Sequence, residues 1–264
     1  MTPGGEYVMA ETGAASESDR LGLLESARDP RTIGRLRELG VGAGWRCLEV
    51  GAGRGSIARW LAERVTPAGS VVAADIDPRF LTDMPENVEV RRLDIREDEV
   101  EAGHYDLVHC RALLMHLPDP AQALARLAAA LRPGGLLFAE EGDYGLYHYG
   151  GHPDARALTE GAHRALDAMT AAGVLNARFG RALPAMLSEC GLQLQGSEIE
   201  TGVSQPGEPH YEFMRSTVLE SLPALLAAGV MDDANVERLE SYFGQPGTII
   251  TGPSLVAAWG QRRA

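Results

Sequence analysis

A glycine-rich turn lies between a short apolar run and a helical pattern in the stretch CLEVGAGRGS (47–56). Its glycines, Gly51, Gly53 and Gly55, alternate with other residues, and the apolar run WRCLEV (45–50) leads into them. Glycine has no Cβ atom, so it allows the backbone to approach a ligand closely. A strand that enters such a turn and continues into a helix is typical of nucleotide-binding α/β folds. The stretch therefore predicts that part of a nucleotide binds after the first strand.

Strand-like and helix-like patterns alternate along the first half of the chain. Apolar or alternating runs predict seven strands, at residues 45–50, 70–76, 88–95, 105–110, 136–141, 192–201 and 254–263. Apolar residues spaced three and four apart predict helices at 56–65 and from Asp119 to the stop signal RPGG at 132–135. This rhythm predicts an α/β, Rossmann-like sheet of seven mostly parallel strands, with helices on both faces and helical lid insertions.

The chain before the first strand is expected to form an N-terminal lid segment and a helix, over residues 1–44. The helical pattern begins at Asp19 and is expected to break near Asp29–Pro30, because proline removes a backbone donor. Gly40 follows its last apolar position and is expected to end it.

The Rossmann-like domain is expected to extend over residues 45–264 and to carry two helical insertions, at about 143–190 and 205–246. Both insertions follow a predicted strand. Ligands of open α/β sheets bind outside the carboxyl ends of the strands. The insertions are therefore predicted to lie over the ligand crevice.

The charge and the cysteines limit the classes of partner and compartment. The formal net charge of −13 opposes binding to nucleic acid and to anionic membranes, since both are polyanions. The three cysteines lie far apart in apolar runs, which predicts buried thiols rather than disulfides or metal ligands. The start of the chain lacks a signal-peptide pattern, and no apolar run approaches a bilayer's width. We expect a cytoplasmic protein without a metal.

The glycine pattern distinguishes two classes of cofactor. A dinucleotide-binding turn requires G-x-G-x-x-G, but Ser56 stands where the third glycine would be. Glu49 has no role in that pattern. The arrangement EVGAGRG (49–55) instead resembles motif I of class I S-adenosylmethionine (SAM) methyltransferases. Further segments resemble later blocks of that family, in its order and spacing: VVAADID (71–77), RRLDI (91–95), HYDLVHCRALLMHLPDP (104–120) and LRPGGLLFAEE (131–141).

The resemblance implies a set of SAM-binding residues. Glu49 would order the glycine loop of Gly51, Gly53 and Gly55 and meet the ammonium group, directly or through water. Asp75 would accept hydrogen bonds from the two ribose hydroxyls, and a charged acceptor makes such bonds stronger.

The adenine would meet a second group of residues. Asp94 would accept from the adenine amino group, and Ile76 and Ile95 would sandwich the ring. Arg54, in the glycine loop, is either a cofactor contact or a surface arginine. Arg111 follows the fourth strand, where it binds the SAM carboxylate or a substrate anion, or pairs with a structural acid.

Candidate catalytic groups follow from the need of a hydroxyl or phenol acceptor for a general base. Histidine titrates near neutral pH, and His116 and His148 are the candidates, with Asp143 beside the second. The segment GDYGLYHYGGHP (142–153) mixes aromatic and polar residues, which suits a planar organic substrate. The alternatives are a structural histidine at 116 and a loop whose tyrosines cover the sheet edge.

The sequence thus predicts a SAM-dependent methyltransferase that methylates oxygen or nitrogen of a small molecule, and releases S-adenosylhomocysteine (SAH). A secondary metabolite is the expected acceptor class. The alternative is a protein of this fold that binds SAM but catalyses a non-methylating reaction such as a cyclisation. A non-enzymatic SAM-binding protein and an NAD-dependent oxidoreductase are weaker alternatives. A homodimer is left open.

Overall fold

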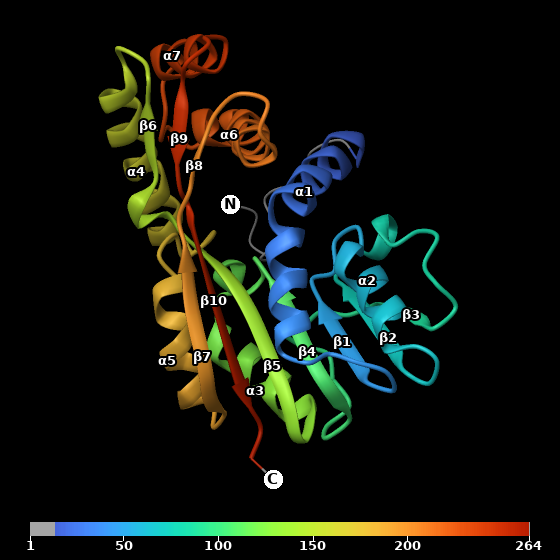
Figure 1. Ribbon diagram of the computed structural model, residues 1–264. Helices are drawn as coiled ribbons and strands as arrows, with labels where there is room; N and C mark the ends of the chain where they lie inside the picture. Colours follow the sequence, from blue (N-terminus) through green and yellow to red (C-terminus); the bar gives the residue numbers. More distant parts are fainter. Residues whose placement is uncertain (1–13, 264) are drawn as a thin grey trace. The chain divides into compact units, whose positions relative to one another are not determined.

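A computed structural model of the chain describes residues 14–263. The chain divides into two compact units (Figure 1). The sheet unit comprises Asp29–Gly142, Phe179–Ile199 and Val256–Ala264. The second unit comprises Asp143–Arg178, Glu200–Leu255 and the described residues up to Arg28. No helix within residues 14–263 is both long enough and apolar enough to cross a membrane.

The sheet unit is built on a seven-stranded sheet with the strand order β3-β2-β1-β4-β5-β10-β7. Its strands are β1 (Arg46–Val50), β2 (Ser70–Asp75), β3 (Val88–Arg92), β4 (Tyr105–Arg111), β5 (Leu131–Asp143), β7 (Gln193–Glu200) and β10 (Ser254–Gln261). The chain therefore moves outward from β1 to β3, returns to place β4 on the other side of β1, and continues outward. This reversal beside β1 is the position at which open α/β sheets bind ligands.

The strand directions confirm the expected mostly parallel sheet. β1 pairs in parallel with β2 and β4, β2 with β3, and β4 with β5. β10 runs the other way beside β5, since Gly134 N–H donates to Arg262 O and Arg262 N–H donates back to Gly135 O, both at 2.9 Å. The strands β1 and β4 are buried along nearly their whole length, as expected for parallel strands covered by helices.

The helices of the sheet unit follow the apolar spacing of the sequence. They are α2 (Ser56–Val65), α3 (Pro120–Ala130) and α5 (Leu183–Glu189), with short 3-10 helices at Pro78–Phe80, Leu114–His116 and Gly180–Ala182. α2 buries Ile57, Leu61 and Val65, which are spaced four residues apart on one face. α3 begins as predicted, because the Asp119 side chain accepts the Gln122 N–H at 3.0 Å.

The helix α1 (Ala14–Glu38) corrects one expectation, since it continues through Pro30. The predicted break near Asp29–Pro30 is wrong. The proline is exposed, and the residues around it are fixed to the sheet unit. Asp29 pairs with Arg111, and the Thr32 hydroxyl donates to Glu140. These polar contacts hold the helix across the position where the proline removes a backbone hydrogen bond.

The second unit contains a small antiparallel sheet that the sequence analysis does not anticipate. Its strand order is β6-β9-β8, formed by β6 (His148–Gly150), β8 (Val203–Ser204) and β9 (Ile249–Thr251). The helices of this unit are α4 (Ala155–Ala171), α6 (Pro209–Ala227) and α7 (Asp233–Phe243), and a 3-10 helix spans Tyr144–Leu146. The first region expected to be a helical insertion therefore also contributes the strand β6, whereas β8 and β9 flank the second region.

Tyrosines form the centre of the second unit's core. Tyr147, Tyr149, Tyr211 and Tyr242 are at most 3% exposed and pack with aliphatic side chains of α4, α6 and α7. The Tyr147 hydroxyl donates to the Tyr149 hydroxyl at 2.9 Å. Two of the tyrosines in the segment 142–153 are therefore core residues, which agrees with a structural role for those two side chains.

Candidate functional site

The glycine loop follows β1 and turns sharply. Gly51, Gly53 and Gly55 have φ angles of +75°, +56° and +80°, which are in the left-handed region that favours glycine. The N–H groups of Gly51 and Ala52 donate to Ala74 O on the neighbouring strand β2. A Cβ atom on Gly55 would lie 2.8 Å from Leu81 Cδ2. All three glycines are therefore required by the backbone, and the loop is fixed to the end of β2.

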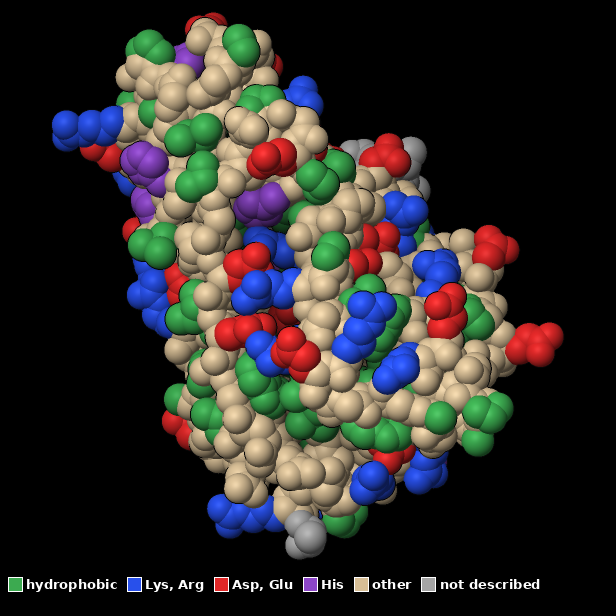
Figure 2. Space-filling model, in the orientation of Figure 1, with side chains coloured by type: hydrophobic (Ala, Val, Ile, Leu, Met, Phe, Trp, Pro, Cys, Tyr) green, Lys and Arg blue, Asp and Glu red, His purple; other side chains and the backbone are tan. Residues whose placement is uncertain are grey.

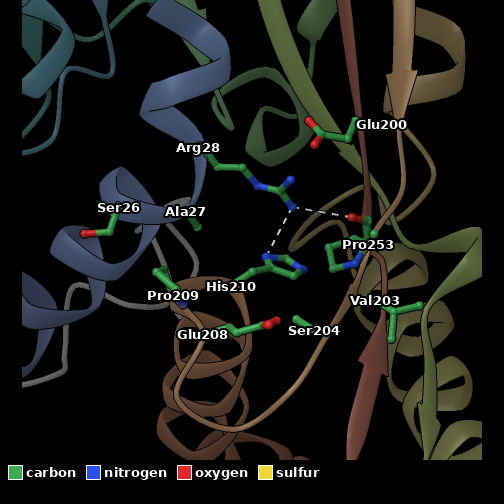
Figure 3. A pocket seen from close by; sticks show the side chains of 11 residues that line it. Ser26, Ala27, Arg28, Glu200, Val203, Ser204, Glu208, Pro209, His210 and Pro253 are labelled. Carbon is green, nitrogen blue, oxygen red and sulfur yellow. Dashed lines mark hydrogen bonds between the residues drawn. The ribbon is translucent and has the colours of Figure 1, made fainter.

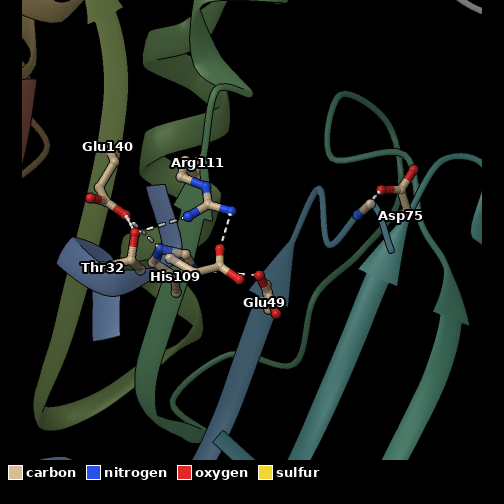
Figure 4. A network of polar contacts seen from close by, with 8 residues as sticks. Thr32, Glu49, Asp75, His109, Arg111 and Glu140 are labelled. Atoms are coloured by element: carbon tan, nitrogen blue, oxygen red, sulfur yellow. Dashed lines mark hydrogen bonds and ion pairs between the residues drawn. The ribbon is translucent and has the colours of Figure 1, made fainter. Parts of the chain in front are cut away.

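Asp75 ends β2 and holds the glycine loop through its carboxylate. Its Oδ2 accepts the Gly53 N–H at 2.9 Å (Figure 4), and its Oδ1 accepts the Asp77 N–H at 3.0 Å. Burial raises the pKa of Asp75, although both N–H groups act in the opposite direction. Each carboxylate oxygen can accept more than one hydrogen bond. The residue can therefore order the loop and still accept from a ligand.

His109 on β4 lies between two glutamates. Its Nε2 atom is 3.4 Å from Glu140 Oε2 on β5, and its Nδ1 atom is 3.6 Å from Glu49 Oε1 on β1. The strand register places Glu49 directly beside His109 (Figure 4). Burial by itself lowers the pKa of His109, but the hydrogen bonds and charges of Glu140 and Glu49 raise it overall. The cationic imidazole is therefore favoured between the two carboxylates.

A hydroxyl and a guanidinium extend this network to α1. The Thr32 hydroxyl donates to Glu140 Oε2 at 2.6 Å and accepts from Arg111 Nη1 at 2.9 Å. Arg111 Nη2 also pairs with Asp29 Oδ1 at 2.9 Å. Burial opposes ionisation of Glu140, but His109, Arg111 and Thr32 lower its pKa below the ordinary value. Arg111 thus pairs with an acid of α1, which was one of its three predicted roles; contact with the SAM carboxylate or a substrate anion stays a prediction.

Glu49 has one carboxylate oxygen without a partner. Its Oε2 is buried and accepts no hydrogen bond from any described residue, and His109 Nδ1, at 3.6 Å from Glu49 Oε1, is beyond hydrogen-bond distance. A buried carboxylate oxygen without a donor is costly. Glu49 stands two residues before the glycine loop, so a cationic or hydrogen-bond-donating ligand in that loop would supply the missing partner. The site therefore fits the ammonium group of SAM.

The predicted adenine residues follow β2 and β3. Ile76 is 43% exposed and Ile95 is 3% exposed. Asp94 accepts from Arg96 through both oxygens, with Oδ1 2.9 Å from Nε and Oδ2 2.7 Å from Nη2. Hydrogen bonding from Arg96 lowers the pKa of Asp94. Asp94 is thus an ionised acceptor whose oxygens already have one cationic partner, and its contact with adenine stays a prediction.

Arg54 lies in the glycine loop between Gly53 and Gly55, as the sequence requires. Its carbonyl oxygen accepts from Arg59 Nη1 at 2.8 Å, which joins the loop to α2. Contact between the Arg54 side chain and the cofactor stays a prediction.

Glu141 is a site residue that the sequence analysis missed. Its fully buried carboxylate accepts three backbone N–H groups, from Leu113 at 3.1 Å, Leu114 at 2.8 Å and Met115 at 3.2 Å. Burial raises the pKa of Glu141 to about 7, against the effect of these N–H groups. A Cβ atom on Gly51 would lie 3.4 Å from Leu113 Cδ1. Glu141 therefore holds the segment after β4 against the glycine loop.

The predicted catalytic residues do not form one cluster within either unit. His116 ends a 3-10 helix in the sheet unit, whereas Asp143 and His148 belong to the second unit. Asp143 is buried and accepts the Gly145 N–H at 2.8 Å. His148 is exposed, with Nδ1 3.4 Å from the Thr159 hydroxyl. Their catalytic roles stay predictions.

Comparison with known proteins identifies the family. The family described as "Methyltransferase domain" matches residues 13–195, which is more than half of the chain. The chain belongs to the class I SAM-dependent methyltransferases. Methyltransferase str2 of Strobilurus tenacellus is 33% identical to this chain over 110 residues, which cover 41% of the chain and 40% of the relative. The chain thus spans less than half the length of this curated relative.

Solved structures share the fold of this chain at low sequence identity. A proposed methyltransferase from Bacillus halodurans has a TM-score of 0.56 at 15% identity, covering 88% of this chain and 99% of that one. The (4+2)-cyclase SpnF also has a TM-score of 0.56, at 16% identity, covering 89% of this chain and 80% of that one. These likenesses confirm the Rossmann-like fold class.

Proposed function

We propose that this methyltransferase binds SAM at the glycine loop and transfers its methyl group to oxygen or nitrogen of a small-molecule acceptor. The observation that carries the proposal is the buried, unpartnered Glu49 Oε2 beside a glycine loop, in a chain of this family. A secondary metabolite is the proposed acceptor class. The Strobilurus relative is named a methyltransferase, which supports the proposal that the transferred group is a methyl group.

The residues of the sheet unit have distinct tasks in this proposal. Asp75 accepts the ribose hydroxyls while it keeps Gly53 in place. Glu49 accepts the ammonium group, and His109 holds the Glu49 carboxylate from its other side. Two carboxylates around one imidazolium leave a net negative charge, which favours a cationic ligand. The network thus favours a cofactor with a positively charged group at this position, whether or not an acceptor is bound.

SAM, when bound, supplies a methyl group that is already activated by its sulfonium. The protein therefore contributes mainly by positioning. Glu141 fixes the segment after β4, and this segment carries His116, the predicted base in the sheet unit. A base is needed when the acceptor proton must leave during transfer.

The surface and charge support a small acceptor. The protein has a net charge of −13, and arginines and acidic side chains are interspersed on the face that Figure 2 shows. Binding to a polyanion requires a continuous set of cations. A small molecule, rather than nucleic acid or a membrane, is therefore the proposed partner, and the cytoplasm the proposed location.

Label transfer from SAM tests the proposal. The pure protein is incubated with methyl-labelled SAM and a small-molecule extract of its source cells, with the variant Glu49→Gln as a matched control. Label in a metabolite, reduced at least tenfold in the variant, is the expected result. Confirmed SAM binding without label, but with consumption of a metabolite, would instead indicate the non-methylating alternative, such as a cyclisation. Absence of SAM binding would contradict both.

A further inference from the structure

His109 is a fully buried histidine of the sheet unit, and both of its ring nitrogens face carboxylates. Nε2 lies 3.4 Å from Glu140 Oε2, and Nδ1 lies 3.6 Å from Glu49 Oε1 (Figure 4). An ionised carboxylate oxygen can only accept a hydrogen bond, and one nitrogen of a neutral imidazole can also only accept. A neutral ring would therefore direct a lone pair at one of the two carboxylates. The geometry favours the imidazolium, which carries a proton on each nitrogen.

The two sides of this ring differ in how their carboxylates are held. Glu140 accepts the Thr32 hydroxyl at 2.6 Å, and Arg111, which pairs with Asp29, lies close to it. Burial acts to raise the pKa of Glu140, but the imidazole, Arg111 and the Thr32 hydroxyl lower it overall. The buried Oε2 of Glu49 has no hydrogen-bond partner among the described residues. A further cation can therefore be accepted on the Glu49 side of the ring.

Two other titratable groups adjoin this cluster. Burial raises the pKa of the Cys110 thiol, which follows His109 on β4, so the thiol stays neutral. Burial also raises the pKa of Glu141, which follows Glu140 on β5, to about 7. The Glu141 carboxylate accepts three backbone N–H groups of residues 113–115. Glu141 can thus titrate near neutral pH, and an experiment on His109 has to distinguish the two residues.

A second histidine of this protein shows the effect of a neighbouring cation on a buried imidazole. Arg28 Nη2 lies 3.3 Å from His210 Nδ1 (Figure 3), and His210 Nε2 lies 3.0 Å from the carbonyl oxygen of Gly252. Burial lowers the pKa of His210 to about 4, and the positive charge of Arg28 acts in the same direction. A cation that binds on the Glu49 side of His109 is therefore expected to favour the neutral form of that ring as well.

We propose that binding of the cofactor's ammonium group at Glu49 is coupled to release of a proton from His109 to the solvent. This inference rests on the proposed function, because it requires that the ammonium group binds at Glu49. Once bound, the ammonium group and the imidazolium share one carboxylate and repel each other. The proton leaves Nδ1, which has no hydrogen-bond partner among the described residues, while Nε2–H keeps its contact with Glu140. One cation enters the cluster and one proton leaves it, so its net charge is unchanged.

The coupling makes the affinity for the cofactor depend on pH. Linkage is reciprocal, so a cofactor that weakens proton binding by His109 is itself bound more weakly when His109 is protonated. We expect a coupling of about tenfold, which is within the ordinary range for two linked sites. Binding should then tighten about tenfold as the pH rises through the titration of His109. A tenfold coupling also corresponds to release of about half a proton per bound cofactor at the pH of greatest release.

Calorimetry on the full chain measures this proton release. SAH and methylthioadenosine are titrated into the wild-type protein from about pH 6 to about pH 8.5, in buffers that differ in ionisation enthalpy. Both ligands contain the adenosine group, but only SAH has the ammonium group. SAH is expected to release about half a proton at the pH of greatest release, and methylthioadenosine none.

Two results of this comparison would overturn the inference: no proton release with SAH at any pH in this range, or equal release with both ligands. A wild-type protein that does not bind SAH would instead contradict the proposed function. The comparison uses only the wild-type protein, so it does not depend on how a variant folds.

Variants assign the proton to its residue. His109→Gln should bind SAH without releasing the proton. His210→Gln is the matched control, because it removes a histidine of the second unit and should leave the release unchanged. Release that persists in a folded His109→Gln variant, as judged by its thermal unfolding, would assign the proton to another group such as Glu141 and overturn the inference.

Discussion

Replacement of Thr32 by valine removes one hydroxyl from the centre of the buried network. Thr32 is 0% exposed, and its hydroxyl donates to Glu140 Oε2 at 2.6 Å and accepts from Arg111 Nη1 at 2.9 Å. Valine keeps nearly the same volume, so the substitution leaves no cavity. It leaves a buried carboxylate oxygen and a guanidinium N–H that each lose one partner.

The expected loss of stability follows from the charges of those two partners. A hydrogen bond to a charged group contributes about 1.5–3 kcal/mol. Glu140 retains His109, and Arg111 retains Asp29, which reduces the loss below the sum of two such bonds. We expect Thr32→Val to lower the free energy of unfolding by about 3 kcal/mol.

The matched control is Thr32→Ser, which keeps the hydroxyl and removes only a methyl group. Its expected cost is about 1 kcal/mol. Chemical denaturation followed by circular dichroism measures the free energy of unfolding of both variants. The comparison requires that this free energy depends on denaturant concentration with the same slope in both. If Thr32→Val costs no more than Thr32→Ser, the hydroxyl does not support the network and the reasoning is refuted.

Three further predictions concern pH and the glycine loop. The contribution of His109 to stability is the free energy of unfolding of the wild type minus that of His109→Gln. It should be present below about pH 6.5 and be lost as the pH rises through the raised folded-state pKa of His109. A difference that grows above pH 6.5 would contradict this. The contribution of Glu141 to the free energy of unfolding, measured against Glu141→Gln, should fall as the pH rises from about 4.5 to about 7 and then level off. The reason is that the folded state binds more protons than the unfolded state in that pH range. A contribution that does not change with pH would show that burial does not raise the pKa of Glu141. Gly55→Ala should lower the stability measured by thermal unfolding more than Gly40→Ala does. Both glycines have φ of +80°, but only at position 55 would the new Cβ atom meet a neighbour, Leu81 Cδ2 at 2.8 Å. Equal losses of about 1 kcal/mol would mean that Leu81 moves away freely.

The sheet and the glycine loop could be predicted from the sequence because local signals carry them. The buried strands are short apolar runs, and the glycines Gly51, Gly53 and Gly55 stand where the backbone adopts positive φ angles. Asp119 and Pro120 begin α3 where the sequence places its start. Each of these features depends on residues within a few positions of one another.

Contacts between distant segments could not be predicted in the same way. Thr32 and Glu140 are 108 positions apart, and neither residue has a local feature that pairs them. The same contacts keep α1 helical through Pro30, which local rules predict as a break. The sequence showed three tyrosines near His148 but not that Tyr147 and Tyr149 enter a core formed with α6 and α7. Glu141 gave a weak signal, as a second acid at the end of an otherwise apolar strand.

The central claim is that SAM binds at the glycine loop between Glu49 and Asp75, and calorimetric titration of SAM into the wild-type protein and Asp75→Asn tests it most directly. Asparagine keeps the size of the side chain but removes its charge, so the charge-assisted bonds to the ribose are weakened by about 2 kcal/mol. The account predicts that the wild type binds SAM and SAH and that the variant binds about 30-fold more weakly, while remaining folded. Unchanged affinity in the variant, or no binding by a folded wild-type protein, would contradict it.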